Sequence, residues 1–546
     1  MLKRACLLVF LAAAAVLGQQ HMHSAAKETG PAPLLEGLGH LHHAISTSSP
    51  QAQRYFDQGL TLVYAFNHEE AARSFRYAAQ LDPKCAMAFW GVALAVGPNY
   101  NDSDIDMNRM KEAVEASRKA VALEPKVSEN ERAYADAIAK RFSLDPKADR
   151  HQLAVNYKNA MGALMRRYPN DLDAAVLYAD AAMNLNPWQL WTLDGKPAAG
   201  TQEIVDVLKS VLKRAPEHIG ANHLYIHATE ASPHPEDAAQ SAERLRTLVP
   251  AAGHLVHMPA HTYIRTGDYH GASVANQKAA AADEAYIKKY GAGGMYPVMY
   301  YTHNLHFLAV SSSMEGRFAV ANVAAAKVVD AASAHVKDVP MAEQFVPTNI
   351  FVLVRFRRWA EIQKLPEADK SMRLAHAFWR FGKGMADAGT VQVDNAVKDR
   401  SLLAAEIKAI PADAVWGYNS AHPVLDVAAL MLDGNIARAR RDYKQAADLL
   451  QKAALAEDRL NYDEPPDWYL PPRESLGAVL FTAGRYSEAE AAFRAELKAH
   501  PKNPRALFGL AECLRAEKKA GEEGVVRKDF TDGWKFADTK LSMGDL

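Results

Sequence analysis

The sequence predicts an all-α fold, a right-handed solenoid built from helical repeats. Two histidine pairs recur at one spacing, since His223 and His257 are 34 residues apart and so are His227 and His261. A 34-residue period is typical of a helix-turn-helix repeat. Small and aromatic residues also recur in register near both ends of the chain. Because each repeat of a solenoid contacts only its neighbours, 546 residues can form one long array.

Small residues at fixed positions predict closely packed helix pairs. In an early repeat, offsets 8, 20, 24, 27 and 32 are occupied by Gly59, Ala71, Phe75, Ala78 and Pro83. In a late repeat, offsets 7, 8, 20, 24 and 32 are occupied by Leu476, Gly477, Ala489, Phe493 and Pro501. The glycines and alanines let two helices approach, the phenylalanine fills the seam, and the proline ends the second helix.

The turns between paired helices carry a further recurring signal. Similar tripeptides stand at Gly267-Asp268-Tyr269, Gly316-Arg317-Phe318, Arg441-Asp442-Tyr443 and Gly484-Arg485-Tyr486. With these motifs in register from about residue 50 to 510, the sequence resembles the tetratricopeptide-repeat (TPR) family. Residues 82–88 and 468–474 resemble, more narrowly, large exported bacterial members. The resemblance implies a superhelix with a concave binding surface and leaves the chemistry open.

The expected domain boundaries depend on where the repeat pattern is clear. Within residues 336–420 the pattern is interrupted by Pro347, Gly382 and Gly384. We expect a signal peptide at 1–20, an extended segment at 21–50, an N-terminal repeat array with a histidine-lined concave face at 51–335, an irregular helical region at 336–420, C-terminal repeats at 421–520 and a cap and tail at 521–546.

The beginning of the sequence predicts export. Lys3-Arg4 precedes an apolar run over residues 5–17 and then Gly18, which is typical of a secretory signal peptide. We therefore expect a periplasmic or secreted protein, with no membrane span after signal removal. The 63 basic and 64 acidic residues nearly cancel, and no basic stripe is interleaved with aromatics. This composition gives no indication of nucleic-acid binding.

One stretch gathers seven of the 21 histidines within 84 residues. They are His223, His227, His254, His257, His261, His303 and His306. The turn motifs and prolines place repeat starts at Ile219 and Gly253, so these histidines take offsets 2, 5 and 9 of first helices, and Glu230 takes offset 12. Spacings of three and four share one helix face. In the family this face lines the concave wall.

Imidazoles on neighbouring inner helices predict a transition-metal site. Packed helices lie about 9 Å apart, which side chains can bridge at a shared ion. Imidazole-rich sites suit copper, zinc or iron. We predict the ligands His223, His227, His257 and His261, closed by His303 and His306, with His254 farther out. Glu230 is either a further ligand or the carboxylate that orients a ligating ring.

Whether such an ion would be catalytic stays open in the sequence. In an enzyme, Tyr263, Tyr301 or Glu230 would be available for proton transfer. The alternative interpretation is a periplasmic interaction scaffold, in which the histidines hydrogen-bond a protein or peptide partner in the concave groove without metal. The sequence indicates no substrate.

Overall fold

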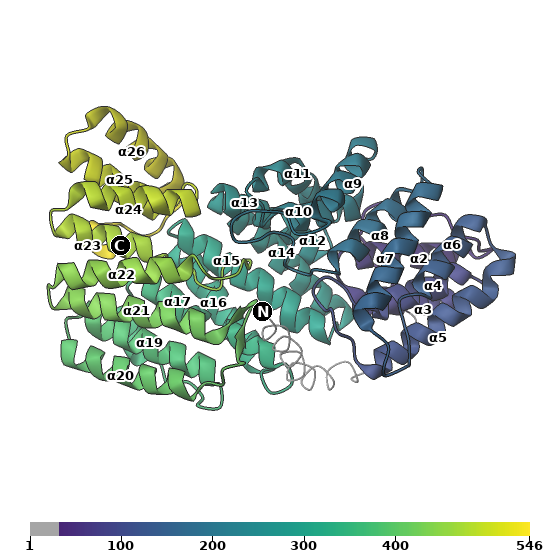
Figure 1. The fold of residues 1–546 in the computed structure, drawn as a ribbon, viewed down its shortest axis with the longest axis horizontal. Helices are drawn as coiled ribbons and strands as arrows, with labels where there is room; N and C mark the ends of the chain where they lie inside the picture. Colours follow the sequence, from purple (N-terminus) through teal and green to yellow (C-terminus); the bar gives the residue numbers. More distant parts are fainter. Residues whose placement is uncertain (1–31) are drawn as a thin grey trace, which may run out of the picture. The chain divides into compact units, whose positions relative to one another are not determined.

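The computed structural model describes residues 32–546, so the signal peptide predicted at 1–20 lies outside the described residues. The described chain is mainly α-helical (Figure 1), and its two named strands, β1 (Val415–Trp416) and β2 (Asn419–Ser420), form one antiparallel hairpin. The predicted all-α fold of repeated helices is confirmed. Two compact units make up the described chain. The first unit comprises residues 32–262 and 278–301, and the second comprises residues 263–277 and 302–546.

Helices of the first unit pack largely against their neighbours in the chain. They are α2 (Pro50–Tyr64), α3 (His68–Leu81), α4 (Ala86–Val96), α5 (Met107–Leu123), α6 (Glu129–Ile138), α7 (Arg150–Arg167), α8 (Leu172–Met183), α9 (Thr201–Arg214), α10 (Ile219–Thr229), α11 (Ala239–Leu248) and α12 (Gly253–His257). Shorter turns are η1 (Glu124–Lys126), η2 (Pro235–Ala238) and the π-helical η3 (Tyr296–Tyr301). The helices α13 (Pro259–Thr266) and α14 (Tyr269–Tyr290) each contribute residues to both units.

Helices α21 to α26 of the second unit stack in chain order, and α19 lies between α20 and α21 (Figure 1). The unit contains α15 (Thr302–Met314), α16 (Phe318–Ser333), α17 (Thr348–Arg355), α18 (Trp359–Lys364), α19 (Arg373–Gly389), α20 (Val393–Ala409), α21 (Ala421–Ala439), α22 (Tyr443–Glu457), α23 (Pro472–Thr482), α24 (Tyr486–Ala499), α25 (Pro504–Ala516), α26 (Ala520–Trp534), η4 (Pro340–Phe345) and η5 (Met543–Asp545). Within residues 336–420, α19 packs against α20, and it also packs against α21, which follows this region.

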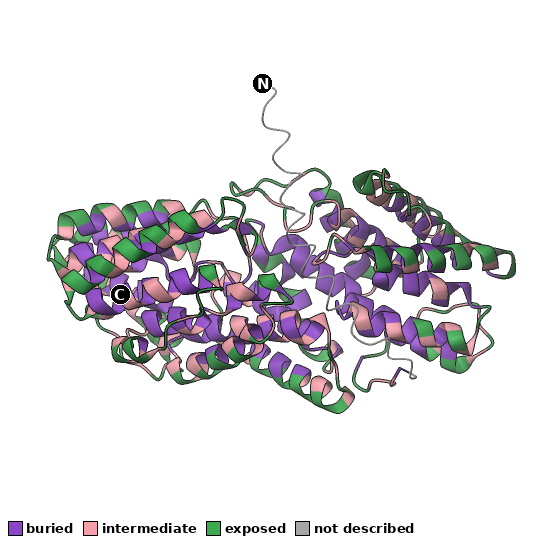
Figure 2. Cartoon of the chain, turned by 90° about the horizontal axis from the view of Figure 1, so that it is seen from below, coloured by how far each residue is buried: buried purple, intermediate pink, exposed green. Residues whose placement is uncertain are grey.

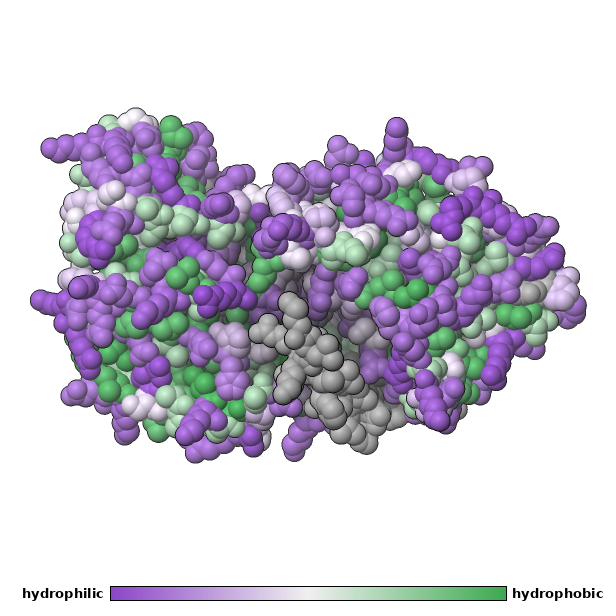
Figure 3. Space-filling model, in the orientation of Figure 1, coloured by the Kyte–Doolittle hydropathy of each residue, from purple (hydrophilic) through white to green (hydrophobic). Residues whose placement is uncertain are grey.

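Burial follows the two faces of each helix. Figure 2 shows buried residues along the sides that helices turn toward each other and exposed residues on the solvent side. On the face drawn in Figure 3, hydrophilic residues cover much of the surface and hydrophobic residues are scattered among them. Across the described helices, none is long and apolar enough to pass through a membrane.

Each predicted phenylalanine lies between the glycines of two helices. A Cβ atom built on Gly59 of α2 would lie 2.6 Å from the ring of Phe75, and one built on Gly91 of α4 would lie 2.3 Å from it. The ring of Phe493 is equally close to Gly477 of α23 and to Gly509 of α25, at 2.5 and 2.2 Å. Phe75 and Phe493 are fully buried. The glycine and phenylalanine positions are therefore explained by packing.

Replacing Gly477 with alanine is expected to destabilise the second unit by about 1–3 kcal/mol, because the added methyl group overpacks the seam against Phe493. Urea unfolding of the purified variant measures the change. Gly521→Ala is the matched control, since this glycine lies in α26 with no atom within 4 Å of its built Cβ. There the helix propensity of alanine should add up to about 1 kcal/mol. Equal effects at both positions would contradict this account of packing.

The helix expected to carry His254, His257 and His261 is broken in the structure. It begins at Gly253, as the repeat register predicts, but α12 ends at His257 and α13 begins at Pro259. Proline has no backbone N–H to donate and its ring clashes with the carbonyl four residues earlier. His261 therefore lies on a separate helix from His254 and His257.

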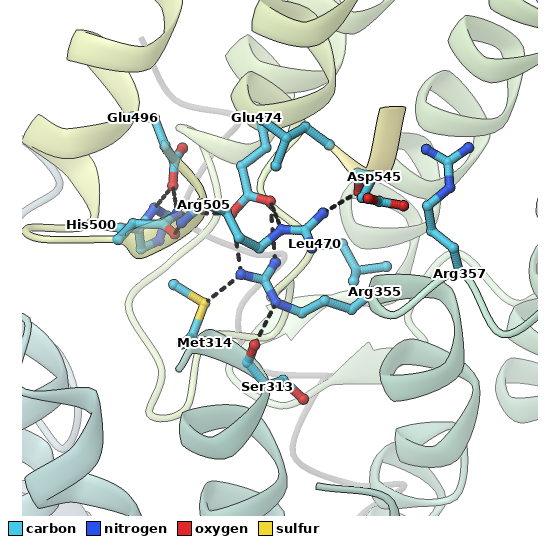
Figure 4. Close-up of polar contacts among 12 residues, drawn as sticks. Ser313, Met314, Arg355, Arg357, Leu470, Glu474, Glu496, His500, Arg505 and Asp545 are labelled. Atoms are coloured by element: carbon cyan, nitrogen blue, oxygen red, sulfur yellow. Dashed lines mark hydrogen bonds and ion pairs between the residues drawn. The ribbon is translucent and has the colours of Figure 1, made fainter. Parts of the chain in front are cut away.

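Buried charges hold the last repeats of the second unit together (Figure 4). The carboxylate of Glu474 accepts from Arg505 Nε at 2.6 Å and from Asn503 Nδ2 at 2.8 Å, and it pairs with Arg355 Nη2 at 3.2 Å. Arg355 also donates to the carbonyl of Ser313 at 3.1 Å. All these charged groups are buried. The cluster joins α17, α23 and α25 through one carboxylate.

Candidate metal centre

The first two predicted ligands, His223 and His227, lie on α10, which begins at Ile219 as the repeat register predicts. Its N-cap is His218, whose Nδ1 accepts from the backbone N–H of Ala221 at 3.3 Å. Every residue of α10 is buried. His223 and His227 are one helical turn apart, and their ring centroids are 4.9 Å apart. The predicted stripe is therefore present and is shielded from solvent.

The backbone of Tyr64 fixes the tautomer of His223. His223 Nδ1 lies 2.6 Å from the carbonyl oxygen of Tyr64. A carbonyl can only accept, so Nδ1 carries the hydrogen and Nε2 keeps its lone pair. Tyr64 is the last residue of α2, where carbonyls have no partner within their own helix. Its hydroxyl donates to Asp173 at 2.7 Å, which anchors Tyr64 at its other end.

Glu230 joins two further imidazoles. Its Oε1 accepts from Nδ1 of His227 at 2.8 Å, and its Oε2 pairs with Nδ1 of His261. A carboxylate that holds Nδ1–H leaves Nε2 available to a metal, which is the usual arrangement around ligating histidines. Of the two roles predicted for Glu230, these contacts match the orienting carboxylate.

Three imidazoles converge at one point in the first unit. Nε2 of His254 lies 3.1 Å from Nε2 of His223. His223, His227 and His254 each offer a nitrogen within 4.8 Å of the other two, and all three side chains are buried. His254, which the sequence analysis placed farther out, thus lies beside His223.

A second group adjoins the first. His227, Glu230 and His261 also offer ligand atoms within 4.8 Å of one another. Nε2 of His261 lies 2.7 Å from Nε2 of His257, a hydrogen-bond distance. His227 belongs to both groups, so the five imidazoles of the first unit form one continuous cluster.

Burial favours the neutral form of His223 and His261, whereas nearby histidines favour the charged form of Glu230. The pKa of His223 is far below its ordinary value because of burial, and nearby His227 lowers it further. Burial also lowers the pKa of His261, although Glu230 partly opposes this. For Glu230, burial alone would raise the pKa, but the nearby His261 and His227 outweigh burial and lower it to about 2. Metal ligation requires neutral imidazoles, and the lowered pKa values of His223 and His261 favour that form.

Aromatic rings surround the imidazoles. The ring of Phe66 has centroid distances of 4.4 Å to His223, 5.6 Å to His227 and 5.3 Å to His254. Tyr100 and Trp188 contact His227 at 5.5 and 5.7 Å, and Tyr300 contacts His254 at 5.2 Å.

These rings and Tyr64 were not predicted from the sequence, because they come from other repeats and loops with no shared spacing to the histidines. The one available signal was Phe66 itself. It stands in a repeat turn where other repeats carry glycine, arginine, valine or lysine.

The remaining predicted residues are distributed between the two units. Tyr301 is in the first unit, and its hydroxyl donates to Glu284 at 2.9 Å. Tyr263 is in the second unit and is partly buried. His303 and His306 lie on α15, in the second unit. The ring of His306 packs against Phe345 and Tyr469, and burial lowers its pKa to about 3.

Solved structures that are similar to the chain share little sequence with it. A human IFIT1 dimer with m7Gppp-AAAA is 12% identical, with 91% of this chain and 92% of that chain covered and a TM-score of 0.36. The Cut9–Hcn1 hetero-tetramer is 12% identical, with 89% and 74% covered and a TM-score of 0.30. Naa15/Naa10 bound to HypK-THB is 13% identical, with 89% and 71% covered and a TM-score of 0.22. TM-scores below 0.5 do not constrain function.

A family profile described as "Tetratricopeptide repeat" matches residues 475–524, which include α23, α24 and α25. Among curated proteins, no sequence matches the chain. The matched segment contains Phe493 with its two glycines, and the same packing recurs around Phe75 in the first unit. The chain therefore contains a segment of the tetratricopeptide-repeat family, at residues 475–524.

Proposed function

We propose that the protein binds a transition-metal ion through the imidazoles of its first unit, with His223, His227 and His254 as the central ligands. The proposal rests on the tautomers of His223 and His227. Nδ1 of His223 and Nδ1 of His227 are both held by acceptors, so both Nε2 lone pairs are available. Nε2 of His227 is buried and has no hydrogen-bond partner among the described residues. Leaving such an atom unpaired costs about 1–3 kcal/mol, which a bound ion would remove.

The geometry of the donors is compatible with coordination. Two nitrogens that bind one ion tetrahedrally at about 2.0–2.1 Å are separated by about 3.3 Å. The two Nε2 atoms of His223 and His254 are 3.1 Å apart. Copper, zinc or iron fits an imidazole set of this kind. His257 and His261 would support a neighbouring position in the same unit.

A wider role follows from the family. Tetratricopeptide repeats generally mediate protein interactions, so we also propose a protein or peptide partner for the groove predicted from the repeats. Export to the periplasm or the medium is part of the same proposal, because an exported protein can take up metal outside the cytoplasm.

Elemental analysis of the untagged full chain tests the metal proposal. After equilibration with copper, zinc and iron salts and removal of loosely bound ions, we expect about one or two equivalents per chain. The variant His223→Ala/His227→Ala should retain less than about a tenth of an equivalent. His234→Ala is the matched control, since His234 lies close in sequence but is exposed beside Glu236. It should bind as much metal as the unaltered chain.

Thermal unfolding gives a second, independent readout. A metal at 100 times its Kd should stabilise the folded chain by about 2.7 kcal/mol, and chelation should reverse this. If the unaltered chain binds no metal after reconstitution and shows no thermal shift, the metal proposal is wrong. The histidines would then be assigned to a polar groove for a peptide.

A further inference from the structure

Residues 535–546 follow the last long helix of the second unit and return to helices that lie far earlier in the chain. The carboxylate of Asp538 accepts from the backbone N–H groups of Phe318 and Ala319, at 2.7 and 2.9 Å, in the first turn of α16. N–H groups at the start of a helix have no partner within it and attract negative charge. Asp538 is therefore a firm anchor for the residues that come after it.

Residues 542–546, called the tail below, lie in a cleft of the second unit lined by α17, α21, α23 and α25. Three arginines donate to main-chain carbonyls of the tail, and they are Arg357, Arg438 and Arg505. Arg438 Nη1 lies 2.8 Å from the carbonyl oxygen of Leu546, and its Nη2 lies 3.0 Å from that of Gly544. Arg357 also donates to Gly544, and Arg505 donates to Asp545 (Figure 4).

The arginines contact the tail in a way that depends little on its sequence. Every residue of a peptide offers a carbonyl, so these hydrogen bonds are available to almost any extended segment. Leu546 is the one tail residue that is buried, at 3% exposed, and the other four are partly or fully exposed. The cleft therefore accepts a peptide main chain and one apolar side chain, and the tail supplies both.

The positive charge in the cleft favours an acidic peptide over a neutral one. Burial lowers the pKa of Arg357 to about 10, nearby Arg438 lowers it further, and Asp545 partly opposes this. The carboxylate of Asp545 itself accepts from the backbone N–H and the hydroxyl of Ser542, at 2.8 and 2.6 Å. A carboxylate in place of the Gly544 carbonyl would add an opposite charge and could accept two parallel hydrogen bonds from one guanidinium.

We propose that this cleft is a binding site for an acidic peptide segment of another protein, and that residues 542–546 occupy it as a built-in competitor. This inference rests on the peptide partner proposed above and goes beyond it, because it specifies a cleft of the second unit, a carboxylate opposite Arg357 and Arg438, and the segment that must leave. It is independent of the metal site in the first unit.

The anchor makes the tail an effective competitor. Only residues 539–541 separate Asp538 from the tail, so the tail stays close to the cleft even when it is released. A short tether presents a segment at about millimolar effective concentration. A partner therefore displaces the tail only if it binds the arginines more tightly than main-chain carbonyls do.

Fluorescence anisotropy with a labelled peptide tests this competition. The peptide has the sequence of residues 541–546, and it is titrated with the full chain and with a chain that lacks residues 542–546. The shortened chain should bind the peptide, and the full chain should bind it at least about tenfold more weakly, because its own tail competes. A peptide carrying Gly544→Glu should bind at least about tenfold more tightly than one carrying Gly544→Lys, because the lysine meets like charges.

A matched pair of arginines provides the control. In the shortened chain, Arg438→Ala should weaken peptide binding at least about tenfold, since two hydrogen bonds from a charged donor are lost. Arg440→Ala should leave it unchanged, because Arg440 is exposed at the end of the same helix. Leu546→Lys in the full chain should also raise peptide affinity, because it puts a positive charge beside the arginines. This variant covers the case in which the shortened chain does not fold.

Each outcome decides between distinct statements. If the full chain binds the peptide as tightly as the shortened chain does, the tail is not a competitor. If the two substituted peptides bind equally well, the partner is not acidic. If the shortened chain is folded by circular dichroism and binds none of the peptides, the tail only caps the last repeats and the inference is wrong. Metal binding, measured on the same samples, and a peptide partner elsewhere in the groove would still stand.

Discussion

Replacing Glu474 with glutamine is expected to lower the free energy of unfolding by about 3–5 kcal/mol. This is the usual effect of removing one charged partner from a buried ion pair, because the other charge stays buried and uncompensated. Glutamine has nearly the same shape, so packing is retained while the charge is lost. Arg355 and Arg505, both buried, would then face each other without the carboxylate that each contacts. Urea unfolding followed by circular dichroism measures the difference.

Glu488→Gln is the control for this prediction. Glu488 pairs with Arg485 at the surface, and its side chain is 58% exposed. Exposed pairs of this kind contribute about 0.2–1 kcal/mol. A loss of similar size in the two variants would show that burial of the Glu474 cluster adds nothing to its contribution to stability.

The same substitution, Glu474→Gln, should remove a pH dependence of the folding stability. Burial alone would raise the pKa of Glu474, but Arg355 and Arg505 outweigh burial and lower it to about 2. The folded value thus lies below the unfolded value of about 4.3, so the carboxylate stabilises the fold above pH ~4.3 and this contribution is lost as the pH falls toward ~2. The lost stability amounts to about 3 kcal/mol. The unaltered chain and Glu474→Gln should therefore converge in stability as the pH is lowered through this window.

Replacing Glu230 with glutamine is expected to weaken metal binding by about 10- to 100-fold, the usual effect of losing a residue that orients ligands. The two oxygens of Glu230 contact Nδ1 of His227 and Nδ1 of His261. A glutamine side chain offers one oxygen and one NH2 group, so it can accept from only one of these N–H groups and would oppose the other. Chelator competition on the reconstituted protein measures the affinity.

Glu315→Gln is the matched control for Glu230→Gln. Glu315 is a buried carboxylate in the second unit and pairs with Nδ1 of His270 at 2.9 Å. This substitution should reduce stability and leave metal affinity unchanged. If it weakens metal binding as much as Glu230→Gln does, the loss reflects general destabilisation and Glu230 has no special role.

Repeat register predicted helix starts and the histidine face, since both depend on local sequence. Ile219 and Gly253 begin α10 and α12 as the offsets require. The end of α12 was missed because register alone does not account for Pro259, although proline is the residue type that ends helices. The orienting contacts of Glu230 were one of two predicted roles, because a spacing places a carboxylate near an imidazole and does not say which nitrogen it meets.

Contacts between distant repeats could not be predicted from the sequence. The carbonyl of Tyr64 bonds His223 across 159 positions in sequence, and Phe66 contacts the same cluster. No spacing relates these residues, because the curvature that brings α2 beside α10 is the sum of small rotations over several repeats. A backbone carbonyl also leaves no mark in the sequence. The histidine cluster could therefore be predicted from the sequence, whereas the carbonyl and the ring that contact it could not.

The phenylalanines seated between paired glycines set the size of the cooperative unit. Phe493 lies on α24 and fills the space over Gly477 of α23 and Gly509 of α25 at once. Separating α25 from α24 would uncover the same ring that stabilises α23, so these three helices cannot open independently at low cost. A solenoid is often described as a chain of separable repeats. Here the two repeats share one ring, so opening one repeat also destabilises the next repeat.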